Sequence, residues 1–148
     1  MVDQGLMERI KAANVSWSKH VVSELNDIQY DNEADILYIG YGQPREAFSL
    51  PIGTPDEDIH LRIDVDTHEI VGINILGFRE VFLDKHQDAR EAFNPFFELL
   101  GDSDWRFQIR LPSERDDAQF ALFMPASRPF LEYFPAYIPK VAPNLVPA

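Results

Sequence analysis

The chain has 148 residues, no cysteine and a net charge of −12. That length is typical of one domain, so we expect a single domain over residues 1–148. The acidic balance argues against binding to nucleic acid or to an acidic membrane surface, because both need clustered Lys and Arg, and the missing cysteines exclude disulfides and thiolate ligands.

The N-terminal segment, residues 1–27, is expected to be helical. Leu6, Ile10, Ala13 and Trp17 recur at helical spacing, which predicts a helix over about residues 3–13. The first residues lack the basic start and apolar run of a signal peptide, and no segment reaches the ~18 apolar residues of a membrane span. We therefore expect a soluble protein of the cytoplasm.

Two β-hairpins are predicted between residues 28 and 76. The apolar runs at 28–30 and 36–41 flank a five-residue acidic break at 31–35, which is typical of a turn between two strands. In the second hairpin, apolar residues at 59, 61, 63 and 65 alternate with polar ones, and a turn at 66–68 returns the chain into the β-branched run 69–76. One face of the strand at 59–65 is thus expected to be apolar and the other polar.

These hairpins carry two motifs, Tyr30-Asp31-x-Glu33-Ala34-Asp35-x-Leu37-Tyr38-Ile39 and Asp64-x-Asp66-x-x-x-Ile70-Val71-Gly72-Ile73-x-Ile75-Leu76. In this order they resemble the small bacterial family called domain of unknown function 2283, over residues 30–78. The chain departs from the family's pattern in a long insert at 42–58 and in His68, where a glycine-like turn residue is expected. The resemblance implies a compact β-rich domain and no established chemistry.

A helix is predicted over about residues 84–100. One face of it is apolar and largely aromatic, formed by Ala89, Ala92, Phe93, Phe96, Phe97 and Leu100. Asp84 and Gln87 resemble a capping box, and Gly101 is a natural stop. Pro95 predicts either a kink or a fresh start with Asn94 as the N-cap.

The chain beyond this helix predicts two more strands and an extended tail. Alternation over 105–111 and the apolar run 118–124 indicate a further hairpin. Residues 125–148 hold six of the eleven prolines together with four aromatic residues and aliphatic ones such as Ile138. Proline at this density argues against a regular helix or central strand, whereas the aromatic content argues against disorder, so we expect an extended tail that docks.

The docked tail is also expected to cover an apolar face of the sheet. The strand at 36–41 is apolar on both sides, so both faces of the sheet need cover. The helix at 84–100 covers one face, and the tail is expected to cover the other. Since an exposed apolar face of this size would invite association, we also expect a homodimer.

The predicted turns place acidic side chains at one rim of the sheet. In a simple meander the turns at 31–35 and 64–69 close the same end, because two antiparallel reversals separate them. This rim would hold the carboxylates of Asp31, Glu33, Asp35, Asp64, Asp66 and Glu69. Oxygen ligands of this kind suit Ca²⁺ or Mg²⁺, so these residues are the candidate metal ligands, although solvated turn residues explain them as well.

A second candidate site is the polar row on the strand at 59–65. His60 and Arg62 lie on one face of that strand with Asp64. They are candidate ligand-binding residues, suited to an anionic ligand or to proton transfer; the alternative is the polar face of a half-exposed strand.

Taken together, the sequence predicts an α+β fold. It has an antiparallel β-meander of five or six strands, one helix packed across a face, an N-terminal helix and a docked proline-rich tail. The first functional hypothesis is a non-catalytic binding or interaction domain, with a basic protein as one partner, because residues 28–83 carry eleven acidic and three basic side chains. The alternative is a divalent-metal-dependent enzyme or a metal-regulated domain that uses the acidic rim.

Overall fold

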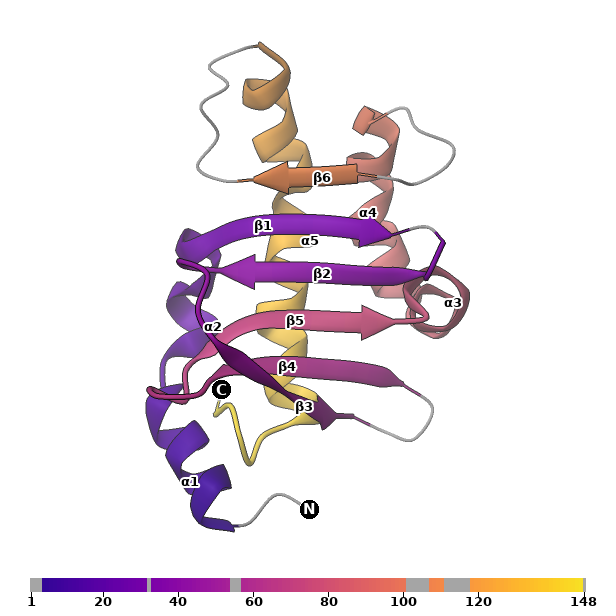
Figure 1. The fold of residues 1–148 in the computed structure, drawn as a ribbon. Helices are drawn as coiled ribbons and strands as arrows, with labels where there is room; N and C mark the ends of the chain where they lie inside the picture. The colour runs from indigo at the N-terminus through magenta and orange to yellow at the C-terminus, as the bar shows by residue number, and fades with distance from the viewer. Residues whose placement is uncertain (1–3, 32, 54–56, 101–106, 111–117, 148) are drawn as a thin grey trace.

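The protein has an α+β fold in which helices lie against an antiparallel sheet (Figure 1). The computed structural model describes residues 4–31, 33–53, 57–100, 107–110 and 118–147, without the side chains of 95–128 and of Phe130. The strands are β1 (Leu25–Asp31), β2 (Ile36–Tyr41), β3 (Ala47–Ile52), β4 (Asp58–Asp64), β5 (Ile70–Leu76) and β6 (Phe107–Arg110). The helices are α1 (Gln4–Ala13), α2 (Trp17–His20), η1 (Val21–Glu24), η2 (Phe78–Phe82), α3 (Leu83–Lys85), α4 (Gln87–Leu100) and α5 (Ala118–Val141).

The sheet has the strand order β3-β4-β5-β2-β1-β6, and every neighbouring pair is antiparallel. Both predicted hairpins are confirmed as β1–β2 and β4–β5. The predicted meander is wrong in one respect, because the insert at 42–58 contains a strand of its own, β3. β3 pairs with β4 at the edge of the sheet, where Pro51 costs no ladder bond on the solvent side.

One face of the sheet forms the core. Alternate side chains from the five strands β1 to β5 are buried on it, which follows from the two-residue period of a strand. They are Ile28, Tyr30, Leu37, Ile39, Tyr41, Leu50, Ile59, Leu61, Ile63, Ile73 and Ile75. The register puts them side by side: Ile28 lies opposite Ile39, and Ile73 is flanked by Ile39 and Leu61.

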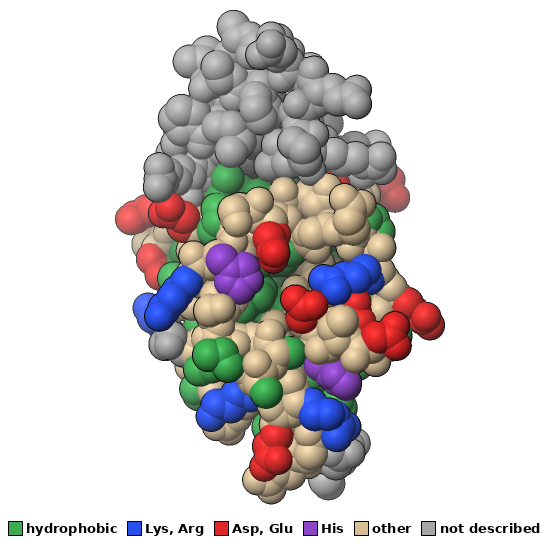
Figure 2. All heavy atoms as spheres, turned by 90° about the vertical axis from the view of Figure 1, so that its left-hand side faces the viewer, with side chains coloured by type: hydrophobic (Ala, Val, Ile, Leu, Met, Phe, Trp, Pro, Cys, Tyr) green, Lys and Arg blue, Asp and Glu red, His purple; other side chains and the backbone are tan. Residues whose placement is uncertain are grey.

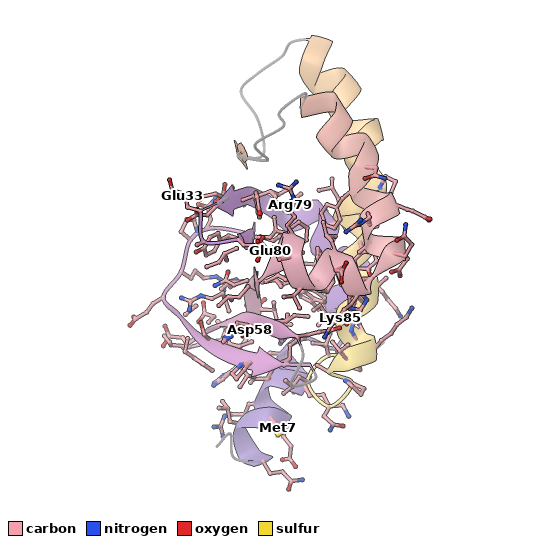
Figure 3. All side chains as sticks on the ribbon, turned by 90° about the vertical axis from the view of Figure 1, so that its right-hand side faces the viewer. Met7, Glu33, Asp58, Arg79, Glu80 and Lys85 are labelled. Carbon is pink, nitrogen blue, oxygen red and sulfur yellow. The ribbon has the colours of Figure 1, made fainter. Side chains whose placement is uncertain are left out.

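The helices α4 and α5 both cover this apolar face (Figures 1 and 3). The ring of Phe93 in α4 lies 4.9 Å from Phe78 and 6.0 Å from Phe134 in α5, measured between ring centroids. The predicted helix is confirmed, but it begins at Gln87 rather than at a cap on Asp84, because Asp84 already belongs to α3. It runs through Pro95 without the fresh start at Asn94.

The C-terminal segment corrects the sequence analysis. The predicted strand at 118–124 and the predicted extended tail are both part of α5, which runs to Val141. Its buried residues Leu131, Phe134 and Ile138 recur at helical spacing, and Ala142 continues the stripe. The tail docks as expected, but as a helix, because burial of this stripe offsets the hydrogen bonds that its prolines cannot make.

The opposite face of the sheet is open among the described residues, so the expectation that the tail covers it is wrong. Figure 3 shows the side chains of this face pointing away from the helices. The half-buried Tyr38 of β2 lies between Gln29 and Asn74, and Gly40 lies opposite Gly72. Polar neighbours and glycines therefore surround the apolar side chains of β2, and an antiparallel sheet tolerates such a face in water.

Candidate functional site

The two acidic turns lie at opposite ends of the sheet, so the predicted common rim does not exist (Figure 1). The turn after Asp31 lies at the end where Leu76 pairs with both Ile36 and Asp58. The turn after Asp64 lies at the other end, beyond the pair of Ile63 and Ile70. The cause is β3: one additional strand between the hairpins reverses the direction of everything that follows.

At the first end, the carboxylates hold the backbone of turns. Asp31 accepts hydrogen bonds from the N–H groups of Glu33 and Ala34 at 3.0 and 3.2 Å. Asp35 accepts one from the Tyr30 hydroxyl at 2.7 Å, and two more from the N–H groups of Arg79 and Glu80 at the start of η2. Figure 3 looks onto this end and shows Glu33, Arg79 and Glu80 there.

At the second end, Asp64 is buried and organises the β4–β5 turn. Its carboxylate accepts hydrogen bonds from the N–H groups of Asp66 and Thr67 at 2.7 and 2.9 Å. The Thr67 and Asp66 bonds hold the pKa of Asp64 below its usual range, against the effect of burial, and the guanidinium of Arg45 at 3.2 Å adds to this. Arg45 also pairs with Glu69 at 3.3 Å.

His68 closes the same turn in the left-handed conformation, with φ of 66°. The backbone therefore does here what the family resemblance predicts of a glycine, with a histidine in its place. The buried side chain of Asn14 secures the turn to the end of α1, since its amide donates to the carbonyl of His68 at 3.0 Å and accepts from the N–H of Ile70 at 3.0 Å. The hydrogen bonds of Asp64 and of Asn14 therefore both stabilise the backbone of this turn.

Ca²⁺ or Mg²⁺ has no assembled site among the described residues, where no three His, Cys, Asp or Glu side chains converge. The six candidate ligands are divided between the two ends. Those nearest to each other already accept hydrogen bonds from turn N–H groups or pair with Arg45.

His60 and Arg62 lie together on the open face of β4, as predicted. Each is engaged with a neighbour: the Nε2 atom of His60 lies 2.6 Å from Asp58, and Arg62 donates to the Ser49 hydroxyl at 2.6 Å and to the Ala47 carbonyl at 3.0 Å. Arg62 thus leans across to the edge strand β3. Asp64 does not join them, because its carboxylate is turned into the β4–β5 turn.

A polar cluster that the sequence analysis missed joins three distant segments. The Nε2 atom of His86, between α3 and α4, lies 2.5 Å from one oxygen of Glu57, and the Tyr137 hydroxyl of α5 donates to the other oxygen at 2.7 Å. Burial, and then the bond to Glu57, raise the pKa of Tyr137. His86 also stacks on Phe82, with centroids 4.4 Å apart. No local pattern signals this cluster, because its members are 29 and 80 residues from Glu57 in sequence.

A groove of about 800 Å³ lies between the segment α2–η1 and helix α5. Val22, Pro135 and Pro139 supply apolar surface, and Ser18 and Ser23 supply hydroxyl groups. Its charged lining residues are Lys19, His20, Glu132 and Lys140. Figure 2 shows the side of the molecule on which α2 lies, with hydrophobic side chains exposed among those of Lys and Arg.

The two lysines of this groove, Lys19 and Lys140, have no carboxylate partner among the described residues. His20 lies 3.9 Å from Glu24, but neither Lys19 nor Lys140 pairs with a carboxylate anywhere in the described part of the chain. They come from opposite walls of the groove, α2 and α5. Sequence reasoning missed this site because it depends on the tail being a helix.

A comparison of the chain with family models, with curated proteins and with solved structures found no match. The resemblance to domain of unknown function 2283 therefore stays a prediction. Among the described residues, no helix is both long enough and apolar enough to cross a membrane.

Proposed function

We propose that the protein is a non-catalytic binding domain, and that the groove between α2–η1 and α5 holds a small carboxylate with an apolar body. The observation that carries this proposal is the pairing of an apolar groove surface with two lysines that have no carboxylate partner among the described residues. A volume of about 800 Å³ is in the range of small-molecule sites.

The local charge supports an anionic group on the ligand. The chain as a whole carries −12, yet the groove combines Lys19, Lys140 and His20 with the single acidic residue Glu132. A basic site on an acidic protein is what charge complementarity requires for a carboxylate. Val22, Pro135 and Pro139 would lie against the apolar body of the same ligand, removing its surface from water.

Binding is favoured over catalysis by the state of the other titratable clusters. His86, Glu57 and Tyr137 are bonded to one another, and His60 is bonded to Asp58. A group that works as a general acid or base must reach a substrate proton. In this fold His86, Glu57 and Tyr137 instead connect separate segments, and His60 pairs within β4. Neither cluster lines the groove.

The test is a titration of the full chain with 4-methylpentanoate, a branched carboxylate of matching character, followed by calorimetry. The double variant Lys19→Gln and Lys140→Gln should weaken binding about fivefold for each lysine, the upper range for an exposed ion pair. Lys11→Gln is the matched control, because Lys11 is an exposed lysine in the last turn of α1 that does not line the groove. Equal affinity in the double variant, or no binding to the wild type at millimolar concentration, would contradict the proposal.

A further inference from the structure

The groove follows α5 lengthwise over about two turns of the helix. The residues that line it from α5 recur at the spacing of one helix face, i, i+3, i+4, i+7 and i+8. They are Glu132, Pro135, Ala136, Pro139 and Lys140. At a rise of about 1.5 Å per residue, this wall is about 12 Å long between its two charged residues, so the groove has room for an extended chain along the helix.

The opposite wall, α2 and η1, runs antiparallel to α5. Figure 1 shows the chain passing upward from α1 through α2 to the start of β1, whereas α5 runs downward from its orange N-terminal part to its yellow C-terminal part. Both α2 and η1 contact α5. Lys19 on α2 therefore lies toward the end of the groove that holds Lys140, and η1 lies toward the end that holds Glu132. The groove thus has one basic end and one acidic end.

Between these ends the groove is lined by small side chains. None of its uncharged lining residues is larger than valine: Ser18, Val22, Ser23, Pro135, Ala136 and Pro139. Ala136 is exposed and lies midway along the α5 wall, four residues from Glu132 and four from Lys140. A methyl group at this position leaves the middle of the groove open, whereas a larger side chain would fill it.

We propose that the natural ligand is a straight-chain monocarboxylate of medium length, a free fatty acid, that lies lengthwise in the groove. This inference rests on the proposed function and specifies its ligand. The carboxylate pairs with Lys19 and Lys140, and the alkyl chain passes over Ala136 toward η1. The methyl end then lies near Glu132, where a second carboxylate would be repelled. Ala136 is the residue that determines which chains fit, because its side chain sets the depth of the groove at the middle.

The first test is the dependence of affinity on chain length, measured by calorimetry on the full chain with hexanoate, octanoate and decanoate. Complete burial of one CH₂ group raises affinity about fourfold, and a groove that is open to water along one side should give at least about twofold. Decanoate should therefore bind at least about tenfold more tightly than hexanoate, with one ligand per chain. Equal affinities of the three acids would overturn the lengthwise alkyl chain.

The second test fills the middle of the groove. Ala136→Leu places a branched side chain where the alkyl chain should pass, so decanoate should bind about tenfold more weakly than to the wild type. Ala12→Leu is the matched control, because Ala12 is an exposed alanine of α1 that does not line the groove, and it should leave the affinity of decanoate unchanged. An unchanged dependence on chain length in Ala136→Leu would show that the chain lies elsewhere and would overturn the inference.

The third test concerns the orientation of the ligand. Decanedioate, which has a second carboxylate in place of the methyl end, should bind more weakly than decanoate. Part of this difference comes from Glu132, so Glu132→Gln should narrow it about twofold, the range of an exposed charge pair. A difference that is the same in Glu132→Gln and in the wild type would overturn the proposed orientation.

The outcomes separate the two proposals. Hexanoate is the straight-chain isomer of 4-methylpentanoate, so it links the series to the test of the carboxylate site. Binding of both isomers without any gain from longer chains overturns the fatty acid and leaves the carboxylate site standing. Failure of every monocarboxylate to bind at millimolar concentration overturns the proposed function as well.

Discussion

The strands of the sheet form where the local sequence predicts them, whereas the helix α5 forms where its prolines argue against a helix. In β4, the apolar residues Ile59, Leu61 and Ile63 alternate with polar ones, and the structure buries those three. In α5, four prolines at 125, 129, 135 and 139 argue against a helix, and the structure forms one of 24 residues. Local preference and burial agree in the sheet and disagree in α5.

The difference shows when burial overrides local preference. The prolines of α5 fall in two pairs with a spacing of four, so the lost N–H groups of each pair lie on one side of the helix. Leu131, Phe134 and Ile138 form a stripe that meets the core, and Pro135 and Pro139 are buried beside it. The second pair of prolines therefore removes hydrogen bonds from the helix while its rings belong to the buried apolar surface.

Deleting residues 125–148 tests this contrast with the largest expected effect. The deletion removes Phe134, Ile138 and Val146 from the core, each worth about 1.5–3 kcal/mol, together with other buried groups. That sum approaches the whole stability of an ordinary domain, so the truncated protein should be largely unfolded or aggregated. Circular dichroism and light scattering measure this, and light scattering of the intact chain also tests the predicted homodimer. An unchanged melting temperature and mass would show that α5 is a passive appendage.

A single substitution in the stripe should have the next largest effect. Phe134→Ala leaves a cavity between the rings of Phe82 and Phe93, which lie 5.7 and 6.0 Å from Phe134. The expected loss is about 3–5 kcal/mol in the free energy of unfolding, measured by urea denaturation. Val15→Ala is the control, because Val15 is 62% exposed and its truncation should change stability by less than about 0.5 kcal/mol. Similar values for the two variants would contradict the described packing of α5.

Removing a proline should move stability in the other direction. Pro129→Ala at an exposed position of α5 returns a backbone N–H to the helix. A gain of about 2 kcal/mol is expected: roughly 3 kcal/mol from helix propensity, reduced by the greater entropy of the unfolded chain. Thermal unfolding measures it, and a loss of stability would indicate that this part of α5 is not helical in solution.

The smallest effect is expected in the sheet, at Asp64. Because its pKa is below the usual 3.8 in the folded protein, Asp64 stabilises the fold above that pH and loses the contribution as the pH falls further. Asp64→Asn should therefore lower the melting temperature by a few degrees at pH 7, with a difference that shrinks in acid. Asp66→Asn is the control, since Asp66 contributes its backbone N–H to the turn. A difference independent of pH would show that charge at Asp64 is unimportant.

Much of the fold could be predicted from the sequence because its strongest patterns are also buried. The two hairpins, α1 and the body of α4 follow from the period of their apolar residues alone. β3 was not predicted, because the insert at 42–58 was interpreted as a departure from the family pattern. Without β3, the later strands are predicted to run in the wrong direction, and Asp31 and Asp64 are then placed at the same end of the sheet.

The candidate site could not be predicted, for a different physical reason. Lys19 and Lys140 become neighbours of one groove only when α5 lies beside α2 and η1, and the proline rule argued against α5. His60 and Arg62 were correctly placed on one face of β4, but the partners of Arg62, Ser49 and Ala47, depend on the position of β3.

The most direct test of the central claim, that the groove is the binding site, is a titration of the ¹⁵N-labelled full chain with 4-methylpentanoate followed by ¹H–¹⁵N NMR. The amides of Ser18, Lys19, Val22, Ala136 and Lys140 should shift, because these residues line the groove. Those of His60, Arg62 and Asn74 on the open face of the sheet should stay in place. Shifts confined to the open face, or no shifts at millimolar ligand, would contradict the claim.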